Sequence, residues 1–420
     1  MSFYSQFVNI RYLEPHHHNQ HNRTEWKLPD DIVAYPNLRL CNVGLNGAIG
    51  SLSKMGCVSL IRHVSLYSDR ELIDTLRYAN QWHSFNQLTE SNAANKDVNS
   101  VLEKSKIGYT IDSSAQSISK DSENAVTVAA DETKGSGGFV QLPKLLKFLQ
   151  SDGLVLDTSK LKNLRVVVEW ETNKLKYLDS GTNNNFNIPQ PTLIYDEIEN
   201  PQIAAQLSAQ VGNLTWSCME HDAFDAPAIK NSGTGHQQAL NRRLKGFDNK
   251  FVSRMLIQKN FVNPGLIGKP GNLVSGKGWY RSPVQHKEQV NLKVNSKPLF
   301  SENLDNDAIK SYMTKETWGA LNLQFYEDQL SAGVDNPVDG NLNFIGVPAN
   351  KDEFVGYASY VGCVVNNRIK DLEVHYSRVN PQDSTAAIKR YGEHLNINVW
   401  GEVAKQLIMG KNGEFTVRYL

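Results

Sequence analysis

Residues 192–198, TLIYDEI, and residues 395–403, LNINVWGEV, are two strand-like stretches that indicate how the whole chain is organised. Within them, YDEI at 195–198 aligns with WGEV at 400–403, at an offset of 205 residues (400 − 195). A match of this kind between the end of each half of a chain is typical of an internal repeat. A true repeat should also match in the preceding strand of each half.

A second pair of matching stretches lies one strand earlier in each half. EW at 169–170 aligns with HY at 375–376, at an offset of 206 residues (375 − 169), and both halves place a strand and then a helix before these strands. At 420 residues the chain also exceeds the usual single-domain size of about 100 to 150 residues. We expect one β-sandwich used twice, with a first sandwich at 41–200 and a second at 201–420.

Composition and period-two alternation predict the remaining strands. They are expected at 58–67, 164–170, 289–295, 354–365 and 371–377, and a closing hairpin is expected from 395–400 and 415–419. Helix content is expected mainly at about 70–88, 141–150 and 305–318, where apolar residues recur at steps of three and four. The sequence thus predicts an all-β fold with a few short helices.

Two of the expected helices have one apolar face. The first should begin at the capping-box pattern SDRE, residues 68–71, and its stripe should pack against a sheet. That stripe consists of Leu72, Leu76, Ala79, Trp82 and Phe85. In the helix at 305–318 the apolar face consists of Leu304, Ala308, Ile309, Tyr312 and Met313.

Two polar segments are expected outside the sandwich cores. Residues 1–40 are rich in histidine and asparagine and are interrupted by three prolines, so they predict an extended N-terminal arm that gains order only from a neighbour. We expect this arm to serve assembly and not the folding of the sandwiches. Residues 89–137 are too polar to offset the entropy of ordering, which predicts a long solvent-facing loop.

The composition argues against several classes of function. The 44 basic and 44 acidic side chains cancel, so long-range attraction to a phosphate backbone is missing. Four widely spaced cysteines do not make a disulfide framework, and a reducing compartment is expected. Because no segment has the pattern of a signal peptide or a spanning helix, we expect the chain to stay in the cytosol where it is made.

Two groups of side chains could bind a metal or catalyse hydrolysis. The first group is His16, His17, His18 and His21. The second group is Glu220, His221, Asp222 and Asp225. Histidines on a flexible arm are more often only polar, and the alternation in EHDAFD suits a solvated loop that enters a strand. Since nucleophile elbow, metalloprotease and phosphate-loop motifs are also missing, we predict no catalytic residue, no metal site and no cofactor.

Aromatic and basic residues lead to the same conclusion. Trp82, Trp170, Trp318 and Trp400 all fall in expected elements, so we predict burial in a core or interface and not stacking on sugars or bases. The pair Arg242-Arg243 is expected to form a salt-bridged strand edge, because one basic pair is a weak signal for nucleic acid.

Seven stretches of the sequence resemble the double jelly-roll major capsid proteins of the adenovirus and tailless membrane-containing phage lineage. The pattern is closest to the capsid proteins of virophages and polinton-like viruses. The stretches are SLIRHVSLYSDRELIDTLRYANQWHSF (59–85), GGFVQLPKLLKFLQ (137–150), LRVVVEW (164–170), RLKGFDNKFVSRMLIQ (243–258), QVNLKVNSKPL (289–299), LEVHYSRVN (372–380) and LNINVWGEVAKQLI (395–408). The resemblance is one of pattern and spans about residues 40–420.

The resemblance implies two tandem eight-stranded antiparallel jelly rolls and a structural, non-enzymatic role. It implies homotrimers with a pseudo-hexagonal outline that tile an icosahedral virion shell, assembled inside the host cell. The implied partners are neighbouring trimers, minor capsid or penton proteins and an internal viral membrane, without sequence-specific nucleic-acid binding. Three alternatives stay open: a minor or vertex capsid protein, a carbohydrate-binding jelly roll, and a β-sandwich hydrolase with two carboxylates in a cleft.

Overall fold

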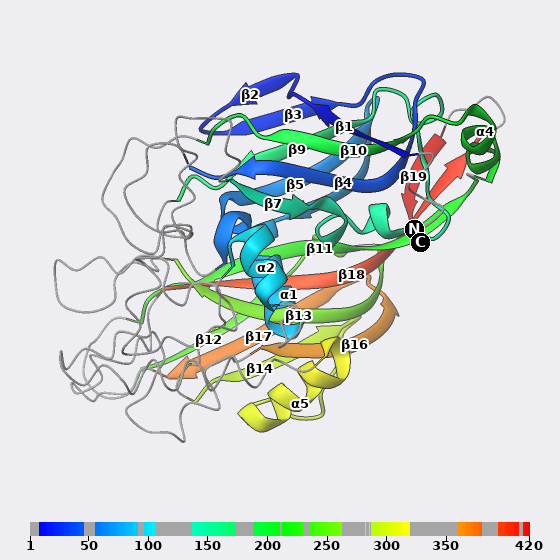
Figure 1. Cartoon of the computed structure of the whole chain (residues 1–420). Coiled ribbons are helices and arrows are strands. Elements are labelled where there is room, and N and C mark those ends of the chain that lie inside the picture. The colour runs from blue at the N-terminus through cyan, green and yellow to red at the C-terminus, as the bar shows by residue number, and fades with distance from the viewer. Residues whose placement is uncertain are drawn as a thin grey trace, which may run out of the picture.

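Strands form four antiparallel sheets in the part of the chain that the computed structural model describes (Figure 1). That part comprises residues 8–45, 55–90, 96–105, 137–173, 188–210, 212–229, 236–262, 282, 285, 287–319, 360–379, 394–410 and 415–420. None of the helices in these ranges combines the length and apolarity that a bilayer-spanning helix needs. The fold is therefore mostly β-sheet, as the sequence predicts.

The N-terminal half of the chain supplies two sheets. Sheet I has the strand order β1 (Val8–Leu13), β10 (Thr192–Ile198), β4 (Val33–Val43) and β7 (Gly138–Gln141), with β8 (Leu156–Asp157) beside β4. Sheet II has the order β2 (His17–Asn19), β3 (Arg23–Lys27), β9 (Arg165–Trp170), β5 (Ile61–Ser68) and β6 (Glu71–Arg77).

The C-terminal half supplies the other two sheets. Sheet III has the order β11 (Leu214–Ala226), β18 (Leu395–Met409), β13 (Phe251–Phe261) and β16 (Val361–Arg368), with β19 (Phe415–Tyr419) beside β18. Sheet IV has the order β12 (Gln237–Arg243), β17 (Leu372–Val379), β14 (Gln289–Val294) and β15 (Lys297–Pro298).

The two halves have the same topology. When β11 to β18 are numbered along the chain, sheet III has the order first, eighth, third, sixth, and sheet IV has the order second, seventh, fourth, fifth. Without the short strands β2 and β8, sheets I and II follow the same two orders. This is the topology of an eight-stranded jelly roll, formed twice. The stretches that match in sequence are the seventh and eighth strands of each half, so the predicted repeat is confirmed.

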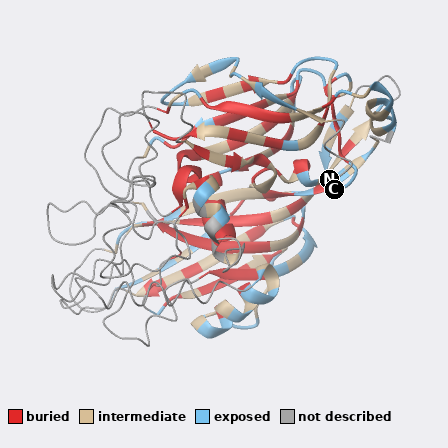
Figure 2. Cartoon of the chain, viewed as in Figure 1, coloured by how far each residue is buried: buried red, intermediate tan, exposed pale blue. Residues whose placement is uncertain are grey.

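Apolar side chains fill the space between the paired sheets (Figure 2). In the first sandwich, Trp26 and Trp170 are completely enclosed, and each indole N–H donates a hydrogen bond. The partner is the carbonyl of Pro191 for Trp26 (3.2 Å) and the hydroxyl of Thr24 for Trp170 (2.9 Å). Buried indole N–H groups need such partners, because an unsatisfied donor is costly.

Short helices connect the strands. They are η2 (Gly56–Leu60), α1 (Ala79–Glu90), α2 (Lys96–Glu103), η4 (Leu142–Lys144), η5 (Lys147–Gln150), α4 (Pro201–Gln210) and α5 (Asp307–Trp318). The expected helix at 305–318 is confirmed as α5, and the one at 141–150 is present as two 3-10 turns whose leucines are buried. Helix α2 lies inside the predicted loop 89–137, so that part of the prediction is wrong; residues 91–95 and 106–136 of that loop lie outside the described ranges.

The expected helix start at residue 70 is wrong. Residues 71–77 form β6, which pairs with β5 in a hairpin, and the helix begins only at Ala79. The Ser68 hydroxyl does not cap a helix, because it donates to the carbonyl of Lys162 (2.7 Å). Asp69 has a positive φ of 48°, a value suited to a tight turn between strands. Ala79, Trp82 and Phe85 are buried in α1 as predicted.

The prediction that residues 1–40 form an arm outside the sandwich is also corrected. Strands β1, β3 and most of β4 fall in this segment, and they pair with β10, β9 and β7 of the first sandwich. The polar residues that suggested an arm lie on partly exposed strand positions, while Trp26 supplies the buried anchor. The segment therefore contributes to the core of the fold.

Removal of residues 1–27 should unfold the first sandwich, because it deletes β1, β2 and β3 together with Trp26. The smaller change Trp26→Ala should lower the free energy of unfolding by about 3–5 kcal/mol, the usual cost of such a truncation in a core. Circular dichroism and urea unfolding of the full chain and both variants would test this. A truncated chain with unchanged strand content and unchanged unfolding midpoint would contradict the assignment.

Candidate functional site

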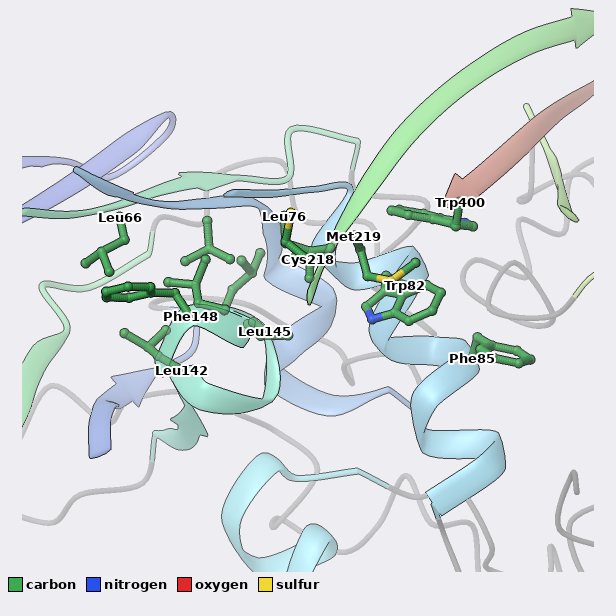
Figure 3. Close-up of a cluster of buried hydrophobic side chains, with 14 of the residues drawn as sticks. Leu66, Leu76, Trp82, Phe85, Leu142, Leu145, Phe148, Cys218, Met219 and Trp400 are labelled. Atoms are coloured by element: carbon green, nitrogen blue, oxygen red, sulfur yellow. The ribbon is translucent and has the colours of Figure 1, made fainter. Parts of the chain in front are cut away.

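Helix α1 lies between the two sandwiches (Figure 1). The Trp82 ring packs at 5.4 Å from Trp400 of β18 and at 5.4 Å from Trp318 of α5, and Phe85 packs at 5.0 Å from Tyr360. Figure 3 shows Trp82 of this helix beside Trp400, with Phe85 further along the same helix. The first sandwich therefore covers part of the outer face of sheet III through this helix. We call this contact the inter-sandwich contact.

Every side chain from Ala79 to Gln87 is buried, including the polar ones. The Asn80 amide donates to the Glu171 carboxylate (3.0 Å), and the Gln258 amide of β13 donates to the Ser84 hydroxyl (3.3 Å). Since buried polar groups must be paired, these bonds fix how the helix is rotated. The helix thus has one orientation against both sandwiches.

Glu103, at the end of α2, joins this network from the first sandwich. His83 of α1 contacts its carboxylate at 2.9 Å, and Lys144 contacts it at 2.9 Å. Burial raises the pKa of Glu103, but His83 and Lys144 outweigh that effect and lower the pKa to about 2. The buried carboxylate is therefore an ion that holds α1, α2 and η4 together.

The candidate hydrolytic group EHDAFD lies on β11, and the structure does not bring its members together. His221 packs with its ring at a tilt between Tyr78 (4.8 Å) and Trp400 (4.4 Å) in the inter-sandwich contact. Its ring also hydrogen-bonds the amide of Asn398 at 2.8 Å. Burial lowers the pKa of His221 to about 4, so the ring is neutral at physiological pH.

The three acids of this group have separate structural partners. Glu220 pairs with Lys250 at 3.1 Å, the Asp222 carboxylate accepts from the Gly246 N–H at 2.9 Å, and Asp225 accepts from the Asn396 amide at 3.0 Å. Side chains on a strand alternate between its two faces, which explains why neighbours in sequence do not converge. The expected solvated loop is wrong, because this segment is a long strand.

The histidines of the N-terminal segment do not form a metal site in the described ranges. His17 and His18 lie on β2, and the His18 ring bonds the Thr24 hydroxyl at 2.8 Å. His21 hydrogen-bonds the neighbouring Gln20 at 3.2 Å. Arg243 on β12 pairs with Asp371 at 2.8 Å, so the predicted salt-bridged strand edge is confirmed for Arg243, while the Arg242 side chain donates to the Asn241 carbonyl (3.3 Å).

A buried carboxylic acid lies where β6 meets the second sandwich. Asp74 accepts from the Phe148 N–H (2.8 Å) and the Thr75 N–H (2.9 Å), and Phe148 in turn packs on Trp216 of β11 at 4.9 Å. Burial raises the pKa of Asp74 to about 6, although nearby Lys405 partly opposes this. Leu76 of the same strand lies next to Cys218 in Figure 3.

A second buried charge cluster lies inside the second sandwich and anchors α5. Glu288 forms ion pairs with Lys259 and with Lys310 of α5 (3.3 Å), and its carboxylate accepts from the Tyr376 hydroxyl (2.8 Å). Burial lowers the pKa of Lys259 to about 8. Burial also raises the pKa of Glu288, but the two lysines outweigh it, and the net shift is downward.

The anchored side of α5 is polar, and its apolar face points to solvent. Lys310 and Thr314 are buried, whereas Ile309 and Tyr312 are 50% and 62% exposed. Of the predicted apolar face, Ala308, Ile309 and Tyr312 are exposed, whereas Leu304 and Met313 are partly buried against the core. The apolar pattern gave no sign that most of this face is left uncovered. The one indication in the sequence is Lys310, which lies on the opposite side of the helix. If Lys310 is buried against an acid, the apolar face must point to solvent.

The raised pKa of Asp74 predicts a pH-dependent stability. The folded-state pKa of about 6 is above the ordinary 3.8, so folding favours the protonated Asp74 carboxyl. The contribution of Asp74 to the unfolding free energy is therefore complete at low pH and is lost as the pH rises through about 6. Between about pH 4 and pH 7.5, Asp74→Asn should gain up to about 3 kcal/mol in unfolding free energy relative to the parent. Urea unfolding across this range measures the difference, and the exposed Asp152→Asn is the control. A constant difference would contradict the assignment.

Loss of the Glu288 charge should strongly destabilise the second sandwich. Glu288→Gln leaves Lys259 and Lys310 buried without their shared counter-charge, which should cost about 3–5 kcal/mol of unfolding free energy. The exposed Glu316→Gln on the solvent side of α5 should cost almost nothing. Urea unfolding compares the two variants, and equal midpoints for both would show that the cluster is not structurally important.

No protein-family model and no curated protein matches the sequence. Solved structures, in contrast, are similar over the whole chain. A chain of the PBCV-1 virus capsid has a TM-score of 0.56 and 11% identity, covering 98% of this chain and 97% of that one. The mavirus major capsid protein has a TM-score of 0.54 and 10% identity, with 98% and 90% covered. The Faustovirus major capsid protein has a TM-score of 0.53 and 8% identity, with 98% and 92% covered.

These similarities extend over both sandwiches. At such low identity they describe the fold, which the strand order above establishes independently. The chain has the double jelly-roll fold of the viral major capsid proteins.

Proposed function

We propose that this chain is a major capsid protein, a structural subunit that forms homotrimers and tiles an icosahedral virion shell. The observation that carries the proposal is the end-to-end similarity to major capsid proteins, which covers 98% of this chain and at least 90% of theirs. A shared single sandwich would be weak support, because jelly rolls have many functions. Two sandwiches in the same order over the full length are much more specific.

The internal repeat supplies a physical reason for this role. We divide the chain into two sandwich domains that meet near α4, and each has the same strand order. Three chains then place six similar sandwiches in a ring, which approximates a hexagon with only three subunits. Closed rings of this kind also cover sheet edges and apolar faces that would otherwise invite unspecific association.

The roles of the polar residues support a structural and non-enzymatic subunit. Glu103 and Glu288 are buried ions that join elements of the fold, and His221 is a packing residue. The balanced charge gives no long-range attraction to nucleic acid. We propose neighbouring trimers, minor capsid or penton proteins, and an internal membrane where the virion has one, as partners, with assembly inside the host cell.

Purified chain should behave as a trimer of about 141 kDa, three times 47.1 kDa, in size-exclusion chromatography with light scattering. Negative-stain images of the same fraction should show particles with a hexagonal outline. A 47.1 kDa monomer at all concentrations tested would contradict the proposal and would favour a single-chain binding protein.

A further inference from the structure

Helices α1 and α5 are equivalent elements of the repeat. Each follows the fifth strand of its sandwich, β6 or β15, and each precedes the sixth strand, β7 or β16. Their surroundings differ, however. Helix α1 is covered by its own sandwich and by the second one, whereas α5 lies at the far side of the second sandwich, with no other described element beyond it in Figure 1.

The orientation of α5 is fixed by its buried side. The Thr314 hydroxyl accepts from the Gly362 N–H (2.9 Å) and lies at 3.2 Å from the Tyr360 carbonyl. A side chain at Gly362 would meet the Trp318 ring at 2.7 Å, so the helix lies directly on β16. With Lys310 bound to Glu288, the helix cannot rotate Ile309 and Tyr312 inward without breaking these contacts.

The surface that receives α1 has an equivalent in the first sandwich. In sheet III, β11 and β18 pair His221 with Trp400 and Met219 with Glu402. In sheet I, the corresponding strands β1 and β10 pair Tyr12 with Ile194 and Ile10 with Asp196. This correspondence is shifted by one residue from the YDEI and WGEV match. On both sheets an acid of the eighth strand binds an arginine of the third strand: Glu402 binds Arg254 at 2.8 Å, and Asp196 binds Arg39.

These equivalent positions differ in what covers them. Met219 is only 5% exposed beneath the first sandwich, and His221 packs against Tyr78. The matching residues of β1, Ile10 and Tyr12, are 53% and 70% exposed. The chain forms this contact once internally, between α1 and sheet III. The two equivalent surfaces, α5 and the outer face of sheet I, are not in contact with each other, and both expose large apolar side chains.

We propose that α5 of one copy docks on the outer face of sheet I of a second copy, with Ile309 and Tyr312 against Ile10 and Tyr12. This contact repeats the inter-sandwich contact between chains. The inference deepens the proposed homotrimer, on which it rests, by naming the two surfaces that join its subunits. Because the surfaces differ and lie at opposite ends of the molecule (Figure 1), the contact is head-to-tail, and it closes into a ring when the rotation allows.

Charge substitution on either surface tests the proposal in the full chain. Tyr312→Asp and Tyr12→Asp should each weaken trimer formation by about thirtyfold or more in dissociation constant, as expected for a central aromatic contact. The matched control is Val101→Asp, which changes an equally apolar and 69% exposed position on α2 and should leave the trimer intact. Sedimentation equilibrium measures the constants, and circular dichroism confirms that all three variants are folded.

A cross-linking experiment tests the head-to-tail arrangement independently. A chain with Tyr12→Cys is mixed with a chain with Tyr312→Cys, exchanged through dilution, and treated with a short bismaleimide. The mixture should give a cross-linked dimer above the parent background from the native cysteines, and either variant alone should not.

The possible outcomes separate the two proposals. If the unmodified chain is a monomer, the proposed function itself fails. If the unmodified chain is a trimer and the Tyr12→Asp and Tyr312→Asp variants remain trimers, only the assignment of the surfaces is wrong. Dissociation of Val101→Asp to the same extent would also overturn the assignment, because the effect would not be specific to the two surfaces.

Discussion

The outer face of sheet III must be kept from water, and the arrangement of the whole molecule follows from that requirement. Trp400 is completely buried there, by a helix that belongs to the other sandwich. Burial of about 200 Å² of an aromatic side chain stabilises by about 5 kcal/mol, which is comparable to the stability of a small domain. The two sandwiches are therefore joined by a core of their own. Their fixed relation holds α5 and β1 at opposite ends of one rigid unit.

Strands were predictable where the sequence carried both composition and alternation. TLIYDEI became β10 with the expected bounds, and β17 buries every second residue from Leu372. Helix α5 was predictable from apolar residues at steps of three and four, and in the structure Asn306 caps its start and Gly319 follows its end. The segment 70–78 was misassigned because Leu72, Leu76 and Ala79 also fit a helical period. Pairing with β5 makes this segment a strand and not a helix. The Ser68 hydroxyl, which a capping box would use, donates instead to the Lys162 carbonyl.

The orientation of α5 and the place of the N-terminal strands could not be predicted from the sequence, for a different physical reason. Periodicity shows which side of a helix is apolar, but burial depends on the charges that other strands bring. Lys310 is buried because Glu288, 22 residues away, neutralises it, and this turns the apolar side outward. The N-terminal segment was misjudged in the same way. Its strands look polar, and only the pairing of Trp170 with Thr24 shows that they complete a core.

The polar residues of α1 and α5 explain why one contact is internal and the other is left for a partner. Asn80 and His83 of α1 are buried and hydrogen-bond Glu171 and Glu103, and these bonds form while the chain folds. These partners belong to the first sandwich, and a polar group that is buried in a contact without its partner costs about 1–3 kcal/mol. The outward face of α5 instead presents two large side chains that can hold an interface without unpaired buried polar groups. An exposed patch of that size is tolerated in water, so a folded chain can stay soluble until it meets another copy.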